Sequence, residues 1–285
     1  MKVAAHYYQQ FDADYGRDVP AEGYGGWHSA QIELAPERTA LVVMHAWDTG
    51  TRERYPGWHR AVEYFQRADA ILKSVFPPLL AAVRASRLRL YHVTSGSYYC
   101  RDLPGYRRAA DLAGPAPELA NRAEPDPVSE RLSEFKQAHA FVGTHNLEDV
   151  GRGFQALRFP REAEPQGDEG VAENAHQLAA LCRADGVNHL LYAGFAINWC
   201  LLMSAGGMVD MSRRGYLCSA IRQAVTAVEN RETARRELAK EIALWRVAVA
   251  FGFVFDADCL VRSLSGAKAS AAVHPTQQGA SSCRC

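Results

Sequence analysis

Short runs of apolar, β-branched residues alternate with helix-like stretches along most of the chain, and this alternation limits the folds open to it. Six such runs predict strands, at residues 40–44, 88–93, 155–159, 188–193, 216–221 and 252–256. The intervening stretches have helical spacing, at residues 58–86, 170–183, 197–213 and 229–249. Repeated strand–helix units pair their strands in parallel through right-handed crossovers. The sequence therefore predicts an α/β fold: a doubly wound, mainly parallel six-stranded sheet with helices on both faces.

The other segments fit around one such domain, which we place at residues 36–264. Residues 1–35 are rich in aromatic side chains without a regular period, which predicts an ordered aromatic arm. Residues 95–155 are polar and punctuated by proline, which predicts an excursion from the domain rather than a second core. The small, polar residues 265–285 predict a disordered tail.

The charge balance limits the partners of the protein. The 285 residues carry 32 Lys and Arg against 32 Asp and Glu, so no net positive charge attracts phosphate backbones or anionic lipid. We therefore expect no nucleic-acid partner and no membrane partner. Seven cysteines without paired spacing favour a reducing compartment, and residues 1–12 contain no apolar run typical of a signal peptide. These features predict a cytoplasmic protein.

Residues 190–209 need a separate explanation, because they contain no charged side chain over the length of a membrane-spanning helix. Small and polar residues interrupt the stretch, at Gly194, Asn198, Ser204, Gly206 and Gly207. We interpret it as a buried strand that runs into a buried helix.

Ligands of open parallel sheets bind at the carboxyl ends of the strands, so residues just after each predicted strand are the first candidates for a site. The most informative segment is residues 193–200, AGFAINWC, where a glycine ends a buried strand and Cys200 falls in the first turn of a helix. Free amides and the positive end of the helix dipole favour a thiolate there, which makes Cys200 a candidate nucleophile. The alternative is that Cys200 is a small apolar residue of the core.

A longer segment around Cys200 resembles a known family. Residues 193–227, AGFAINWCLLMSAGGMVDMSRRGYLCSAIRQAVTA, are similar to the nucleophile segment of the isochorismatase-like cysteine hydrolases. Residues 37–48, ERTALVVMHAWD, resemble the first strand of that family. Together with the order of strands and helices, the resemblance covers residues 35–265 and implies the Rossmann-like fold of these enzymes.

The resemblance also implies functional residues. Cys200 matches the family nucleophile, and the peptide bond between Phe195 and Ala196 matches a cis bond that does not precede proline. The amides of Ala196 and Cys200 match the oxyanion hole, which holds the negative charge that develops on the substrate oxygen.

The chain departs from the family at the catalytic acid. His45 stands where the family has its aspartate, and a histidine within reach of a cysteine can serve as its base. The alternative is a hydrogen-bonded structural histidine. Asp48, three residues later, could orient His45 or replace the carboxylate, or it could cap a turn. His92 and His139 are the remaining candidates for the base.

The family lysine has no direct counterpart. Residues 161–167, REAEPQG, occupy its expected distance before Gly194 and contain no lysine. Lys136, in FKQAHAFVGT, resembles the family lysine segment but lies 58 positions before Gly194. It reaches the site only if the excursion folds back, and otherwise it is a surface lysine. Arg161 could supply the positive charge without the proton chemistry of a lysine.

The aromatic and metal-binding residue types complete the candidates. Aromatic residues after strands could line a pocket or simply pack in the core: Trp47, Trp199, Tyr98 and Tyr99. The available metal ligands form no compact motif: His45, Asp48, His59 and His92. We therefore expect no metal and no other cofactor.

These observations predict a cysteine hydrolase that cleaves a small amide or a related C–N bond through Cys200. The alternative, from another class, is a catalytically impaired relative that keeps the pocket as a small-molecule binding module. In either case the ligand is a small molecule, and we expect a homo-oligomer.

Overall fold

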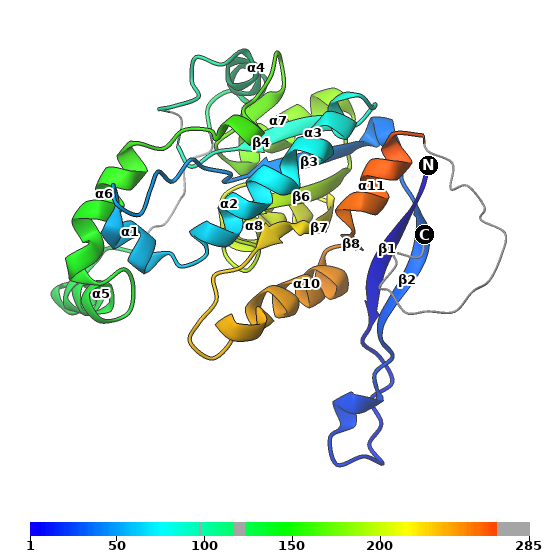
Figure 1. Ribbon diagram of the computed structural model, residues 1–285, viewed down its shortest axis with the longest axis horizontal. Helices are drawn as coiled ribbons and strands as arrows, with labels where there is room; N and C mark the ends of the chain where they lie inside the picture. The colour runs from blue at the N-terminus through cyan, green and yellow to red at the C-terminus, as the bar shows by residue number, and fades with distance from the viewer. Residues whose placement is uncertain (97, 117–122, 267–285) are drawn as a thin grey trace.

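A computed structural model describes residues 1–96, 98–116 and 123–266. These residues form one eight-stranded sheet with helices packed around it (Figure 1). The sheet order is β2-β1-β8-β7-β6-β3-β4-β5. Its strands are β1 (Lys2–Gln9), β2 (Gly26–Glu33), β3 (Thr39–Met44), β4 (Arg89–Val93), β5 (Gly170–Ala172), β6 (His189–Phe195), β7 (Leu217–Thr226) and β8 (Val254–Phe255). Neighbours from β8 to β5 pair in parallel, whereas β1 pairs antiparallel with β2 and β8. The α/β prediction is confirmed, and the count of six strands is wrong because the aromatic arm adds two.

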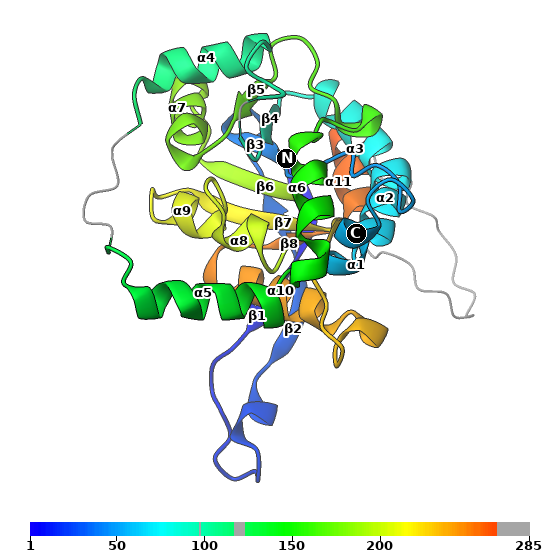
Figure 2. The same cartoon turned by 90° about the vertical axis from the view of Figure 1, so that its left-hand side faces the viewer.

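Helices cover both faces of the sheet (Figure 2). One face packs against α2 (Phe65–Ser74), α3 (Phe76–Arg84) and α11 (Ala257–Leu264). The other packs against α7 (Ala175–Asp185), α9 (Met208–Ser212) and α10 (Leu238–Ala250). Because side chains alternate along a strand, β3 serves both cores. Its Leu41 and Val43 enter the first core, and its Ala40, Val42 and Met44 enter the second.

The third predicted strand, at residues 155–159, is wrong. Gln155 ends helix α6 (Leu147–Gln155), and residues 156–159 form no strand. The strand at this point of the chain is β5, which occupies the start of the helix predicted at residues 170–183. Asn174 explains the boundary, because its side chain accepts a hydrogen bond from the Gln177 amide and caps α7.

The other predicted helices are shorter than expected or divided. Residues 58–86 hold α2, α3 and most of α1 (Pro56–Ala61). The stretch 197–213 is split into α8 (Cys200–Met203) and α9, with Gly206 and Gly207 between them. The helix predicted from residue 229 begins at Leu238, and the Glu229 carboxylate caps it by accepting hydrogen bonds from two amides of its first turn.

The excursion consists of helices, two of which pack against the domain. It contains α4 (Pro104–Ala113), α5 (Pro127–His139) and α6. Helix α4 packs on α7 and α6 packs on α1, while α5 contains no buried residue. The two core clusters of the described residues both belong to the sheet, so the excursion has no core of its own there.

Two further predictions concern the C-terminal tail and the uncharged stretch at residues 190–209. Most of the tail predicted at residues 265–285 lies outside the described residues. The uncharged stretch 190–209 contains most of β6 and then α8, so the buried strand is as predicted, but the helix after it is short and only its Leu201 is buried. Among the described residues, no helix combines the length and the apolar character needed to cross a membrane.

Candidate active site

The predicted site begins where β3 and β6 end together. These strands are parallel neighbours that pair Met44 with Gly194. Gly194 has a φ of +123°, and a Cβ atom on it would lie 1.9 Å from the Met44 carbonyl oxygen. Only glycine fits such a conformation and such a close approach. The two segments that carry His45 and Cys200 therefore leave the sheet side by side.

Cys200 is the first residue of α8, at the end of a tight turn. The peptide bond between Phe195 and Ala196 is cis, as the resemblance implies. The Ala196 carbonyl accepts hydrogen bonds from the amides of Trp199 and Leu201. The amides of Ala196 and Cys200 donate to no acceptor within the described ranges, although Ala196 is only 1% exposed. Two unpaired backbone donors therefore flank the turn that carries the thiol.

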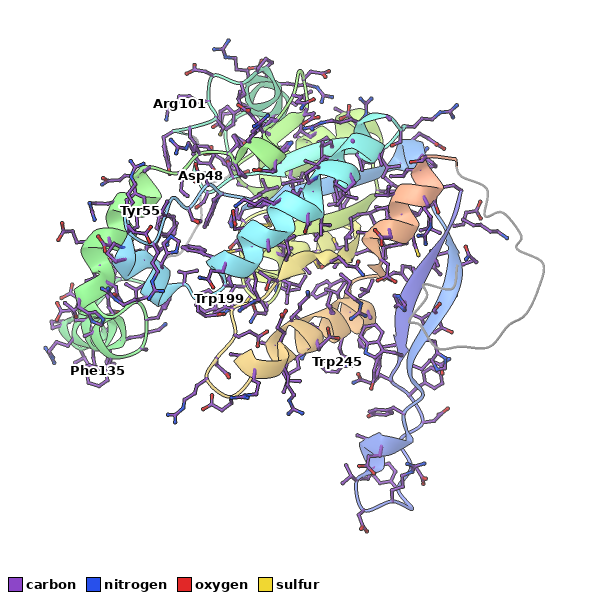
Figure 3. The ribbon with its side chains drawn as sticks, in the orientation of Figure 1. Asp48, Tyr55, Arg101, Phe135, Trp199 and Trp245 are labelled. Atoms are coloured by element: carbon purple, nitrogen blue, oxygen red, sulfur yellow. The ribbon has the colours of Figure 1, made fainter. Side chains whose placement is uncertain are left out.

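Cys200 and Ala196 line an apolar cavity of about 130 Å³. Its other walls are apolar or aromatic side chains: Trp47, Trp58, Ala61, Val62, Tyr64, Phe65, Phe141, Val142, Val150, Phe154, Trp199 and Val228. Part of this wall comes from the excursion, and Phe141 makes an edge contact with Trp199, labelled in Figure 3, at a ring distance of 5.3 Å. The thiol thus faces a small space lined by no charged side chain.

A larger cavity of about 520 Å³ adjoins the first and is polar. His45 and Phe195 line it, together with six charged side chains: Asp48, Arg52, Asp69, Lys73, Arg161 and Glu162. Both cavities share Trp47, Tyr64 and Phe65 as walls. We call this shared set the aromatic partition. It separates His45 on one side from Cys200 on the other.

His45 is held in an unusual conformation directly after β3. Its φ is +51°, in the left-handed region that residues other than glycine rarely adopt, and its amide donates to the Val93 carbonyl. The ring stacks on Trp47 at 4.9 Å and is buried, with the Thr94 backbone as its polar neighbour. Burial of the ring lowers the pKa of His45 to about 4. The imidazole is therefore neutral at pH 7, as a base requires.

The lowered pKa of His45 predicts a loss of stability in acid. The unfolded chain holds this proton below about pH 6.5 and the folded chain only below about pH 4, so the free energy of unfolding falls as the pH drops through this window. The loss from this group is on the order of 3 kcal/mol. We expect His45→Asn, which tolerates the left-handed backbone, to flatten the pH profile of urea unfolding. The same change at exposed His139 is the control, and an unaltered profile for His45→Asn would contradict the prediction.

Asp48 lies at the polar cavity but is held by other groups. Arg158 donates to its carboxylate at 2.7 Å and the Gly50 amide donates at 2.9 Å. Burial raises the pKa of Asp48, but these two donors outweigh it and keep the pKa below its usual value. The carboxylate is therefore ionised and already paired, which is the turn-forming role left open from the sequence.

The remaining predicted bases and the predicted lysine lie elsewhere. Lys136 and His139 are exposed on α5 and line neither cavity. His92 is buried on β4, where its Nε2 lies 3.0 Å from Glu169, and it also lines neither cavity. Within the described residues, the Cys200 sulfur has no hydrogen bond to His45 or to any other group. The proposed Cys200–His45 pair therefore remains a prediction.

Two cations near the site come from other segments. Arg161, considered above as a source of positive charge, does line the polar cavity. Lys73, at the end of α2, also lines it and forms an ion pair with Asp69 at 2.7 Å. Sequence reasoning passed over Lys73, and also Tyr64, which lines the apolar cavity together with Cys200. Burial raises the pKa of Tyr64, and a negative charge on the Cys200 sulfur would raise it further. The aromatic run around residues 55–65 was the available signal.

Metal binding finds no support in the arrangement of ligand types. Among residues 1–96, 98–116 and 123–266, no three His, Cys, Asp or Glu side chains gather as a metal site would require. His59, one of the candidate ligands, lines the polar cavity with its Nε2 3.4 Å from the Thr49 carbonyl oxygen.

Solved structures that are similar to this chain include cysteine hydrolases and isochorismatase-family proteins. A cysteine hydrolase from Pseudomonas syringae pv. phaseolicola is 15% identical with a TM-score of 0.45, over 82% of this chain and 96% of that one. An isochorismatase family protein from Burkholderia thailandensis is 14% identical with a TM-score of 0.46, over 81% and 97%. Isochorismatase-family hydrolases are structural neighbours of this chain. This is the family that residues 193–227 resemble.

A third solved structure belongs to the same group. An isochorismatase-like hydrolase from Alkaliphilus metalliredigens is 16% identical with a TM-score of 0.45, over 79% of this chain and 97% of that one. No protein-family model matches the sequence, and no curated protein matches it either.

Proposed function

We propose that the protein is an isochorismatase-like cysteine hydrolase that cleaves a small amide or a related C–N bond, with Cys200 as the nucleophile. The observation that carries this proposal is the pair of unpaired amides at Ala196 and Cys200. A buried amide without an acceptor is rare in folded proteins, so such a group usually has a ligand to satisfy it. Ala196 supplies such a buried amide, and the amide of Cys200, free because it begins α8, is the second donor beside the thiol; a tetrahedral oxyanion needs two such donors.

The proposed reaction has two steps. The Cys200 sulfur attacks the carbonyl carbon while the two amides hold the oxygen, a C–S bond forms, and the C–N bond breaks as the nitrogen leaves with a proton. Water then hydrolyses the thioester and restores the thiol. His45 is the proposed base, because its ring is neutral at pH 7 and it lines the cavity that shares three walls with the cavity of Cys200. Side chains of the aromatic partition must move for His45 and Cys200 to contact the same substrate.

A small-molecule binding module is the second candidate, and one observation favours it. The Cys200 sulfur has no hydrogen-bonded base within the described residues, and the polar and apolar cavities lie on either side of the aromatic partition. A protein that keeps both cavities without a working nucleophile would bind a small molecule and release it unchanged.

Alkylation of the thiols separates these candidates. If Cys200 is the nucleophile, we expect iodoacetamide at pH 7 to modify it at least about tenfold faster than free cysteine, because the free amides beside the sulfur favour its thiolate. A rate no faster than that of free cysteine favours the binding module. Mass spectrometry of tryptic peptides locates the label.

The other thiols of the chain provide internal controls for this experiment. Cys100, Cys182, Cys218 and Cys259 are buried, and burial raises the pKa of Cys218 to about 12. Cys283 and Cys285 lie outside the described residues, so both are changed to Ser before labelling. His45→Asn is expected to slow the labelling of Cys200 if His45 is its base.

A further inference from the structure

The aromatic arm is a long hairpin that only partly belongs to the sheet. β1 and β2 pair along eight residues each, from Lys2 with Glu33 to Gln9 with Gly26. β8 pairs with β1 only at Ala5 and His6. Figures 1 and 2 show the outer part of the hairpin projecting well beyond the body of the molecule.

Side-chain contacts fix the direction in which the hairpin leaves the body. Near its base, His6 Nε2 lies 2.7 Å from the Asp256 carboxylate. Further out, Trp245 on α10, labelled in Figure 3, donates from its indole to Gln10 at 2.7 Å, and its ring meets the Tyr8 ring edge-on at 6.4 Å. The hairpin is therefore anchored along the C-terminal half of α10.

The tip of the hairpin, residues 11–24, contacts mainly itself. Its hydrogen bonds join Asp14 with Pro20 and Arg17 with Asp14 and Glu22. Three large apolar side chains are exposed there: Phe11 (59%), Tyr15 (87%) and Val19 (53%). A two-stranded hairpin alone is marginally stable in water, and an exposed apolar cluster marks an interaction surface. The tip therefore offers apolar side chains that the described residues leave uncovered.

The charge of the tip indicates what that partner carries. Residues 11–24 contain four acidic side chains and one arginine, a net charge of −3. A basic group lies in the loop before α10, where Arg231, Arg235 and Arg236 are exposed and form no ion pair among the described residues. Of the acids in that loop, Glu229 caps α10 and Glu237 pairs with Lys240, so only one exposed carboxylate opposes the three arginines.

The acidic tip and the basic loop do not meet within one chain, yet they share one side of the molecule. In Figures 1 and 2 both project past the same side of the body, with the loop at the N-terminal end of α10 and the hairpin beside its C-terminal half. The outer face of α10 between them exposes Ile242 (57%) and Val249 (43%). The basic loop, the exposed apolar side chains of α10 and the acidic hairpin therefore follow one another on this side of the molecule, with opposite charges at the two ends.

We propose that this surface binds a second copy of the chain about a two-fold axis. In the dimer each hairpin lies along the α10 of the partner subunit, and its acidic tip meets the arginines of the partner's loop. A two-fold interface brings the same surface of both copies together, so a surface that is acidic at one end and basic at the other pairs with itself when the two α10 helices run antiparallel. The exposed Ile242 and Val249 are then covered.

Charge reversal tests the proposed dimer by light scattering after gel filtration. The full-length protein is expected to be a dimer at micromolar concentration, with a dissociation constant that rises with salt. A loop variant, Arg231→Glu with Arg235→Glu and Arg236→Glu, is expected to weaken the dimer at least about 100-fold, because like charges then face each other. A tip variant, Asp18→Lys with Glu22→Lys, is expected to do the same.

Mixing the two variants gives the decisive result. In a heterodimer of the two variants, one contact joins the reversed tip with the reversed loop and the other joins an unchanged tip with an unchanged loop. Opposite charges meet at both contacts, so the mixture is expected to form a heterodimer. Arg131→Glu on the exposed α5 is the control and should leave the dimer unchanged. A monomeric wild-type protein, a dimer that survives both reversals, or a mixture that stays monomeric overturns the proposal.

Discussion

Cys200→Ala is expected to lower kcat/KM for amide hydrolysis by at least about 1,000-fold, because alanine has no atom that can attack the carbonyl carbon. The amides of residues 196 and 200 remain in the variant, so any residual rate reports what the oxyanion donors provide without the nucleophile. Release of the amine from a panel of small amides, including some with an apolar group that fits about 130 Å³, measures the effect.

Two controls make this experiment specific to the site. Cys218→Ala removes a buried thiol that lines neither cavity, and it should keep kcat within about twofold. Thermal unfolding of both variants shows whether the fold is retained. Full activity of a folded Cys200→Ala protein would exclude Cys200 as the nucleophile, whereas an inactive wild-type protein that binds members of the panel would support the binding module.

Gly194→Ala is expected to lower the free energy of unfolding by at least about 3 kcal/mol. The added Cβ would lie 1.9 Å from the Met44 carbonyl oxygen, a backbone atom that can move only if β3 and β6 separate. The backbone at Gly194 also has a φ of +123°, which side-chain-bearing residues rarely adopt. Urea unfolding followed by circular dichroism measures the change.

A second glycine supplies the matched control for Gly194. Gly151 lies in helix α6, where an added Cβ would have no heavy atom within 4 Å. Gly151→Ala is therefore expected to leave stability unchanged or to raise it by up to about 1 kcal/mol. Equal stabilities for the two variants would show that the approach of β3 to β6 at this point is not as close as described.

The interior strands were predictable because each carries its own local signal. All residues of β3 and β6 are buried, which gives the continuous apolar runs typical of a parallel strand. β1 and β2 lack this signal because they are partly exposed, so their aromatic residues follow no regular period. β5 has only three residues, too few for any period to show.

The candidate site was also predictable only in part. His45 and Cys200 follow strand ends, so their places at one edge of the sheet could be derived from strand order. The cavity walls could not, because Tyr64 and Phe141 reach the site through packing between segments that are far apart in the sequence. Lys73 lines the polar cavity and Lys136 lines neither cavity, which local sequence could not foresee because it does not determine which helix faces the cavity.

The pairing of β1 with β8 has a consequence for the order of events during synthesis. The hairpin can close on itself as soon as residue 33 is available, because its two strands are neighbours in the chain. Its place in the sheet is set by contacts of Ala5 with Phe255 and His6 with Asp256, about 250 residues later. The hairpin is therefore synthesised long before the strand that it pairs with, and its aromatic side chains stay in water until β8 has been made.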